Sequence, residues 1–118
     1  MKDAPPIAIV ETPEFLSTAS RLLSDEERAA LIDFLAYNPM AGALISGAGG
    51  IRKLRWGMEG RGKRGGARVI YFYYNANLPL FMLAAYAKNE QANLSQTDKS
   101  DFKRLTRLLV ENYRRSKA

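Results

Sequence analysis

Hydrophobic positions over the first part of the chain follow first the period of a strand and then that of a helix. The short apolar run 7–11 predicts a strand. Thr12 and Pro13 predict a helix start, because threonine is a favourable N-cap and proline suits the first helical position. Helical spacing continues through Phe15, Leu16, Ala19, Leu22 and Leu23. This segment therefore predicts a strand followed by a helix.

A second helix is predicted to begin at Ser24. Ser24 and Glu27 have the spacing of a capping box, in which each side chain satisfies the free backbone N–H of the other residue. The apolar stripe of this helix is formed by Ala30, Leu31, Phe34 and Leu35. Asn38 and Pro39 predict its end, because a residue that precedes proline disfavours the helical conformation.

The character of the sequence changes between Gly42 and Gly66, where all nine glycines of the chain lie. They predict two loops, 42–50 and 57–66, with a strand over 51–56 between them. Residues 67–74 then predict a strand, because they are rich in β-branched and aromatic side chains.

The last third of the chain predicts the second half of a hairpin and a final helix. The apolar run 80–87 is expected to pair with the strand before it, across a turn at 75–79. Ser95 is a candidate N-cap, with Asp98 three residues later. The helix face is formed by Phe102, Leu105, Leu109 and Tyr113. The polar tail 114–118 is expected to fray.

The predicted order is strand, two helices, three strands and a helix (β-α-α-β-β-β-α). It indicates an α+β fold in which a small, largely antiparallel sheet carries helices packed on it. A chain of 118 residues is expected to form a single domain over 1–118, with a core that needs neither disulfides nor a metal.

The composition limits the chemistry. The sequence has no cysteine, which excludes thiol catalysis and thiolate metal sites. It also has no histidine, the usual acid–base group near neutral pH and the commonest metal ligand. We therefore expect no metal and no cofactor, and any catalysis must use Lys, Arg, Tyr, Asp, Glu, Ser or backbone groups. The apolar run 7–10 is too short for a signal peptide or a membrane span, so a cytoplasmic protein is expected.

The positive charge is concentrated in one short segment. The net charge is +6, and the segment 51–68 alone accounts for +6, since the rest of the chain carries 11 basic and 11 acidic residues. Its only acid is Glu59, and its basic residues are Arg52, Lys53, Arg55, Arg61, Lys63, Arg64 and Arg68. Such a localised basic patch indicates a polyanionic partner.

The strand 51–56 carries the sharpest candidate site. Because side chains alternate between the two faces of a strand, Lys53 and Arg55 should share one face. Leu54, Trp56 and Arg52 should occupy the other. Two cations separated by roughly 6.5–7 Å suit adjacent phosphates or one phosphate held from two sides. A solvent-exposed strand face with no ligand explains the same pattern.

Further candidates lie around this strand. Arg61, Lys63 and Arg64 stand in a glycine-rich loop, where they are expected to contact RNA, although a flexible loop kept soluble by charge is the alternative. Arg52 is likewise expected to bind RNA or the ribosome. Arg68 opens an apolar strand, so it should either pair with an acid or face a binding cleft; its face is ambiguous. Two more candidates complete the set: Lys88 at the end of the last strand, and Tyr71 among the tyrosines that could stack on bases. For most of these tyrosines a place in the core is the alternative.

Three segments together resemble a known family. They are GAGGIRKLRW at 47–56, GKRGGARVIYF at 62–72, and YAKNE at 86–90 followed by NLS at 93–95. In this order and spacing they resemble the HigB-type branch of the RelE toxin superfamily. The resemblance implies a compact sheet-and-helix fold and metal-free cleavage of mRNA in the ribosomal A site. It also implies partners: the ribosome and mRNA, a cognate antitoxin of the helix-turn-helix type, and operator DNA only through the antitoxin complex.

The resemblance also assigns roles. Lys53 and Arg55 match the family's basic pair on the second strand, and Arg68 matches the arginine that opens the third. We expect Lys53 to be the base that activates the 2′-hydroxyl group, because neighbouring cations favour the neutral form of a lysine. Arg68 is expected to clamp the phosphate, with help from Arg55, and Lys88 is the best remaining candidate for the acid.

The sequence departs from RelE itself at two positions. Asn89 stands where RelE has an arginine, and Ser95 lies near the position of its catalytic tyrosine. These departures leave the general acid open. Two rival functions also remain: a gyrase-inhibiting toxin of the ParE type, and a nucleic-acid-binding module without catalysis.

Overall fold

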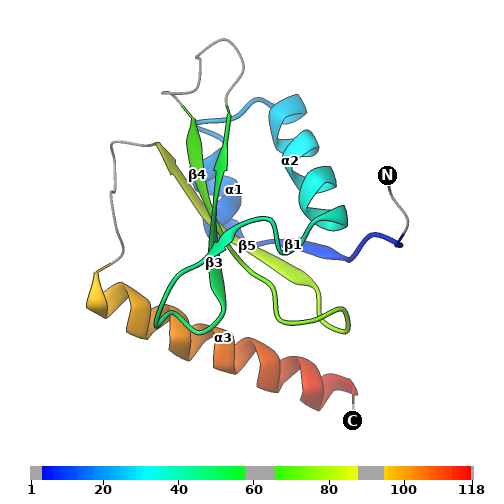
Figure 1. Ribbon diagram of the computed structural model, residues 1–118, viewed down its shortest axis with the longest axis vertical. Helices are drawn as coiled ribbons and strands as arrows, with labels where there is room; N and C mark the ends of the chain where they lie inside the picture. Colours follow the sequence, from blue (N-terminus) through cyan, green and yellow to red (C-terminus); the bar gives the residue numbers. More distant parts are fainter. Residues whose placement is uncertain (1–3, 58–65, 88–94, 118) are drawn as a thin grey trace.

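The computed structural model describes residues 4–57, 66–87 and 95–117 and shows an α+β fold (Figure 1). The elements in chain order are β1 (Ile9–Glu11), α1 (Pro13–Ala19), α2 (Asp25–Tyr37), β2 (Ala43–Leu44), β3 (Ile51–Trp56), β4 (Ala67–Phe72), β5 (Leu80–Ala87) and α3 (Gln96–Lys117). The strands form one sheet in the order β1-β5-β4-β3-β2. All neighbours pair antiparallel except β1 and β5, which pair parallel. The predicted fold class is therefore confirmed.

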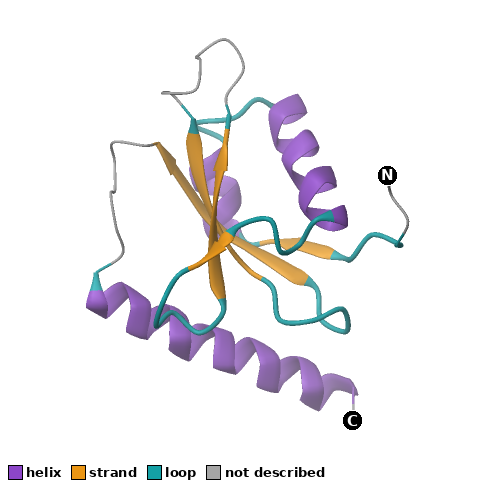
Figure 2. Ribbon diagram, viewed as in Figure 1, coloured by secondary structure: helices purple, strands orange, loops and turns teal. Residues whose placement is uncertain are grey.

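The helices cover the sheet from both sides (Figure 2). One side carries the larger core, where α1 and α2 pack against residues such as Val69 and Tyr71 of β4. The other side carries the smaller core, where α3 packs against Ile51, Ile70 and Phe72. In Figure 1, α3 crosses one end of the sheet, away from the ends of β3 and β4 that lead into the residues drawn in grey.

The N-terminal elements follow the predicted signals closely. The Thr12 hydroxyl accepts a hydrogen bond from the Phe15 amide at 3.2 Å and donates one to the Met82 carbonyl at 2.7 Å. It therefore caps α1 and ties that helix to β5. The capping box of α2 is present, since Ser24 and Glu27 each bond the other's backbone N–H.

The first glycine-rich loop contains a strand that the sequence did not predict. The two-residue β2 pairs with β3, placing Ala43 opposite Lys53 and Leu44 opposite Arg52. Two residues carry too weak a pattern of alternation to predict a strand. The observed order is thus β-α-α-β-β-β-β-α, with four strands after the helices and not three.

Arg52 and Tyr71 hold the connection between α2 and β2 in place. The buried Tyr71 hydroxyl accepts a hydrogen bond from the Gly42 amide at 2.8 Å and donates one to the Pro39 carbonyl at 2.8 Å. The Arg52 guanidinium donates to the carbonyls of Gly42 at 2.7 Å and Met40 at 3.2 Å. These bonds satisfy backbone groups that no helix or ladder could satisfy at this bend.

Tyr71→Phe should therefore lower the free energy of unfolding by about 1–3 kcal/mol, because it leaves the Gly42 amide and the Pro39 carbonyl without their partner. Urea unfolding followed by circular dichroism measures the loss. Tyr73→Phe is the matched control and should change stability by less than about 0.5 kcal/mol. Equal stability of the Tyr71→Phe and wild-type proteins would contradict this account of the bend.

The helix α3 departs from the prediction in two respects. Phe102 and Leu109 pack on the smaller core as expected, but Leu105 is 38% exposed and Thr106 is buried in its place. The packed face therefore keeps Phe102 and Leu109 at their predicted positions and differs from the leucine pattern at 105 and 106. The helix also continues to Lys117, so the described part of the tail that was expected to fray, 114–117, is helical.

Candidate functional site

Lys53, Arg55 and Arg68 lie on the same face of the sheet. On β3, Leu54 and Trp56 pack against the larger core, so Lys53 and Arg55 project from the opposite face. On β4, Arg68 lies opposite Arg55 in the antiparallel ladder. Paired residues of neighbouring strands share a face, which resolves the ambiguity about Arg68. We call these three residues the cationic cluster.

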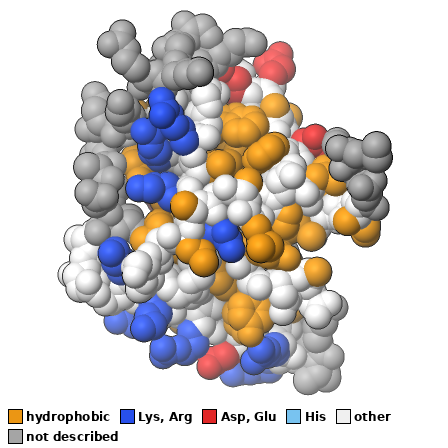
Figure 3. Space-filling view, viewed as in Figure 1, with side chains coloured by type: hydrophobic (Ala, Val, Ile, Leu, Met, Phe, Trp, Pro, Cys, Tyr) orange, Lys and Arg blue, Asp and Glu red, His pale blue; other side chains and the backbone are white. Residues whose placement is uncertain are grey.

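The geometry of the cationic cluster suits an anion. Directly opposed residues on antiparallel strands have Cα atoms roughly 4.5–5.5 Å apart, so Arg55 and Arg68 place two positive charges side by side. Like charges in this arrangement repel and destabilise a sheet. Two guanidinium groups placed side by side can both donate to one phosphate. In Figure 3, a group of Lys and Arg side chains lies at the upper left of the view, apart from a second group at the lower edge.

Tyr86 joins the cationic cluster through an irregularity of the sheet. The β4–β5 register shifts between Ile70 and Tyr71, whose partners are Ala84 and Met82, so Leu83 is an extra residue in β5. Met82 packs in the larger core and Tyr86 in the smaller one, although regular alternation would put both on the same face. The bulge therefore brings Tyr86 to the face of Arg68, directly opposite it in the ladder.

The Tyr86 phenol is expected to stay protonated over the physiological pH range. Burial raises the pKa of Tyr86 above its ordinary value, and the nearby Arg68 guanidinium offsets only part of this rise. A neutral phenol can donate a hydrogen bond or a proton. Tyr86 therefore adds a donor of a different kind to a face otherwise provided with guanidinium and ammonium groups.

The raised pKa values predict how stability depends on pH. Burial also raises the pKa of Tyr71, so the unfolded chain should release both phenol protons near pH 10 while the folded chain still holds them. The contribution of these two phenols to the free energy of unfolding is thus fully present below about pH 10 and declines as the pH rises further. Urea unfolding between about pH 8 and pH 11 should show this decline. In the Tyr86→Phe variant this decline should be shallower than in the wild type. An identical decline in the variant and the wild type would contradict the raised pKa of Tyr86.

Two of the predicted RNA-binding residues have other roles in the structure. Arg52 lies on the face opposite the cationic cluster, with Leu54 and Trp56 as predicted, and it bonds the bend after α2. Tyr71 is fully buried and its hydroxyl is bonded on both sides. A base cannot stack on a ring without exposed surface, so the expectation for Tyr71 is corrected.

The remaining candidates lie outside the described residues. These are Arg61, Lys63 and Arg64 of the second glycine-rich loop, together with Lys88. Their roles stay predictions. The loop that carries the first three leaves β3 after Trp56 and returns to β4 at Ala67, so it connects the two strands of the cationic cluster.

Two features of the chain bear on the class of protein: its described helices and its match to a known family. Within the described residues, no helix is both long enough and apolar enough to cross a membrane. A family model described as the RelE toxin of the RelE/RelB toxin–antitoxin system matches residues 20–116, which span α2, the four strands β2 to β5 and nearly all of α3. Because this match covers most of the chain, the protein belongs to the RelE toxin family.

Proposed function

We propose that the protein is a ribosome-dependent endoribonuclease that cleaves mRNA in the A site and so inhibits translation. One observation carries the proposal: Lys53, Arg55 and Arg68 share a sheet face, and the two arginines lie opposite each other. The family is one of toxins from toxin–antitoxin systems, and a cognate RelB-type antitoxin is its implied partner. The HigB-type branch and a helix-turn-helix antitoxin stay predictions from the sequence.

The proposed reaction is attack by the ribose 2′-hydroxyl group on the adjacent phosphate. Lys53 is the base that accepts the 2′-hydroxyl proton, and the 2′-oxygen forms a bond to phosphorus while the bond to the 5′-oxygen breaks. Arg68 and Arg55 stabilise the charge that builds on the phosphate oxygens. The products are a 2′,3′-cyclic phosphate and a 5′-hydroxyl end, which requires one proton to be delivered to the leaving oxygen.

Two residues compete for the role of proton donor. Lys88 is the candidate from the sequence, at the end of β5. Tyr86 is the candidate that the structure adds, because it faces Arg68 and keeps its proton. If Tyr86 is the donor, Tyr86→Phe should slow cleavage, whereas Lys88→Ala should leave it nearly unchanged. The reverse result assigns the role to Lys88.

The test is translation in a purified ribosome system, with mRNA ends mapped by primer extension for the wild type and Lys53→Ala. Cuts at A-site codons that disappear in the variant are the expected result. Intact mRNA in the presence of wild-type protein would overturn the proposal. A DNA supercoiling assay would then separate a gyrase inhibitor from a nucleic-acid-binding module, for which Lys53→Ala would merely weaken affinity and reduce the salt dependence by about one unit.

A further inference from the structure

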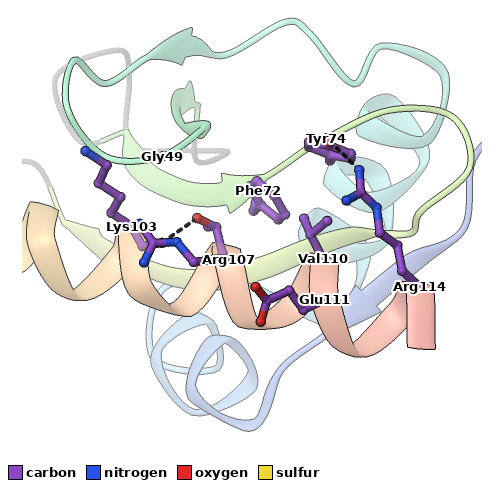
Figure 4. A pocket seen from close by; sticks show the side chains of 9 residues that line it. Gly49, Phe72, Tyr74, Lys103, Arg107, Val110, Glu111 and Arg114 are labelled. Atoms are coloured by element: carbon purple, nitrogen blue, oxygen red, sulfur yellow. Dashed lines mark hydrogen bonds between the residues drawn. The ribbon is translucent and has the colours of Figure 1, made fainter. Parts of the chain in front are cut away.

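A second site lies between α3 and the end of β4, outside the cationic cluster. It is an open cavity of about 320 Å³ (Figure 4). Phe72 and Tyr74 form its aromatic part, and α3 supplies the opposite side. The cationic residues that line it are Lys103, Arg107 and Arg114, and the acidic one is Glu111. We call this cavity the α3 groove.

The cations of the α3 groove form a row along the helix. Arg107 and Arg114 follow Lys103 by four and eleven residues, so all three lie on one helix face. The row extends over about 16 Å. All three side chains are exposed. Among the described residues, no hydrogen bond or ion pair engages the side-chain nitrogens of Lys103 or Arg107. A polyanion could therefore bind both groups without breaking a contact.

The aromatic part of the α3 groove has a held but accessible ring. Tyr74 is 44% exposed, and its ring centroid lies 6.3 Å from that of Phe72. The Arg114 guanidinium lies 5.8 Å from the Tyr74 ring centroid and donates a hydrogen bond to its hydroxyl at 3.0 Å (Figure 4). Such fixed, exposed rings beside cations are typical of surfaces that bind single-stranded nucleic acid, on which bases stack.

The α3 groove and the cationic cluster are connected by a single strand. Arg68 and Phe72 both project from the α3 side of β4, four residues or about 13 Å apart. That distance corresponds to roughly four nucleotides at a stacked rise of 3.4 Å per strand. Ile70, which lies between them on this face, is buried beneath α3, so RNA would pass around the helix and four nucleotides is the minimum span from the cluster to the groove.

We propose that the α3 groove binds a nucleotide of single-stranded RNA a few positions from the phosphate held by the cationic cluster. The inference rests on the proposed function, since it extends the same substrate to a second subsite. An acidic peptide would use the same cations, but it needs no stacking surface and has no reason to share a sheet face with Arg68. The observations therefore favour RNA over a protein partner.

The test measures binding of a fluorescent six-nucleotide RNA by anisotropy, using 2′-O-methyl nucleotides because they lack the attacking hydroxyl. Tyr74→Leu should weaken binding about ten-fold, whereas Tyr74→Trp should preserve it, because tryptophan keeps the stacking surface. Arg107→Gln should weaken binding about five-fold or more. The matched control is Arg104→Gln, which removes the same charge from the same helix at a residue paired with Asp101 and outside the groove. It should change binding less than two-fold.

Three results would overturn the inference. Normal RNA binding by the Tyr74→Leu variant would show that no base stacks on Tyr74. Equal weakening by Arg107→Gln and Arg104→Gln would show only a general effect of charge. Loss of antitoxin binding with unchanged RNA binding would make the groove a protein site. Failure of the proposed function is distinguishable, because binding is measured without cleavage: intact mRNA in the ribosome assay would reject the nuclease and leave this subsite standing.

Discussion

Arg68→Ala is expected to lower the rate of A-site mRNA cleavage at least about 100-fold while leaving the protein folded. Removing one donor that stabilises a developing negative charge typically costs about 10²–10³ in rate. Replacing Arg68 should lower activity without lowering the stability of the fold. The one described hydrogen bond of Arg68 is a weak one, to the Gly66 carbonyl at 3.4 Å. The substitution therefore removes little that holds the fold together, so stability should be nearly unchanged.

The measurement combines primer extension with urea unfolding on the same preparations. Arg104→Ala is the control for charge, because it removes an exposed arginine of α3 that pairs with Asp101 and should keep at least half of the activity. Arg68→Lys should recover only part of the rate, because a lysine supplies charge without the planar pair of donors. Full cleavage by a folded Arg68→Ala protein would reject the assignment of Arg68 as the phosphate clamp.

Gly49→Ala is expected to lower the free energy of unfolding by about 3 kcal/mol, through two separate causes. The first is conformational: Gly49 has φ of +70°, a left-handed value that costs an alanine about 1–2 kcal/mol. The second is contact, because a Cβ atom here would lie 2.7 Å from Thr106 Oγ1 and 2.9 Å from the Lys103 Cα. The loop before β3 and the backbone of α3 approach so closely that only glycine fits between them.

Gly47→Ala separates these two causes. Gly47 has a similar φ of +77°, but its added Cβ would meet nothing within 4 Å. It should therefore cost only about 1–2 kcal/mol, the conformational part alone. Urea unfolding of the two variants gives the contact contribution as their difference. Equal losses would show that the loop moves away from α3 at little cost, contrary to the packing described.

The local elements were predictable because their signals lie within a few residues. The N-caps at Thr12, Ser24 and Ser95 all function as caps, and the strand 51–56 has the bounds expected. Predictions failed where the deciding contact is distant in sequence. β2 is ordered by its pairing with β3, and the stripe of α3 is set by the close approach of Gly49 to Thr106.

In the candidate site, too, local patterns were predictable and contacts between distant segments were not. Alternation on one strand was enough to place Lys53 and Arg55 together, and opposite Leu54 and Trp56. The face of Arg68 needed the β3–β4 register, and that of Tyr86 needed the β5 bulge; neither leaves a clear mark in the sequence. The α3 groove was missed for another reason. Its cations are spread along a helix whose regular polar pattern is equally typical of an ordinary solvated face.

The parallel pairing of β1 with β5 has a consequence for the way the chain is made. β1 leaves the ribosome before the other described strands, yet its partner β5 is the last of them, and the bond from Thr12 to Met82 spans 70 residues. Such distant contacts form late, because they need a large loop to close. During most of translation the N-terminal strand and α1 thus have no sheet to pack on. We expect the nascent toxin to become compact only after β5 emerges, so prematurely terminated chains should be harmless and open to proteolysis.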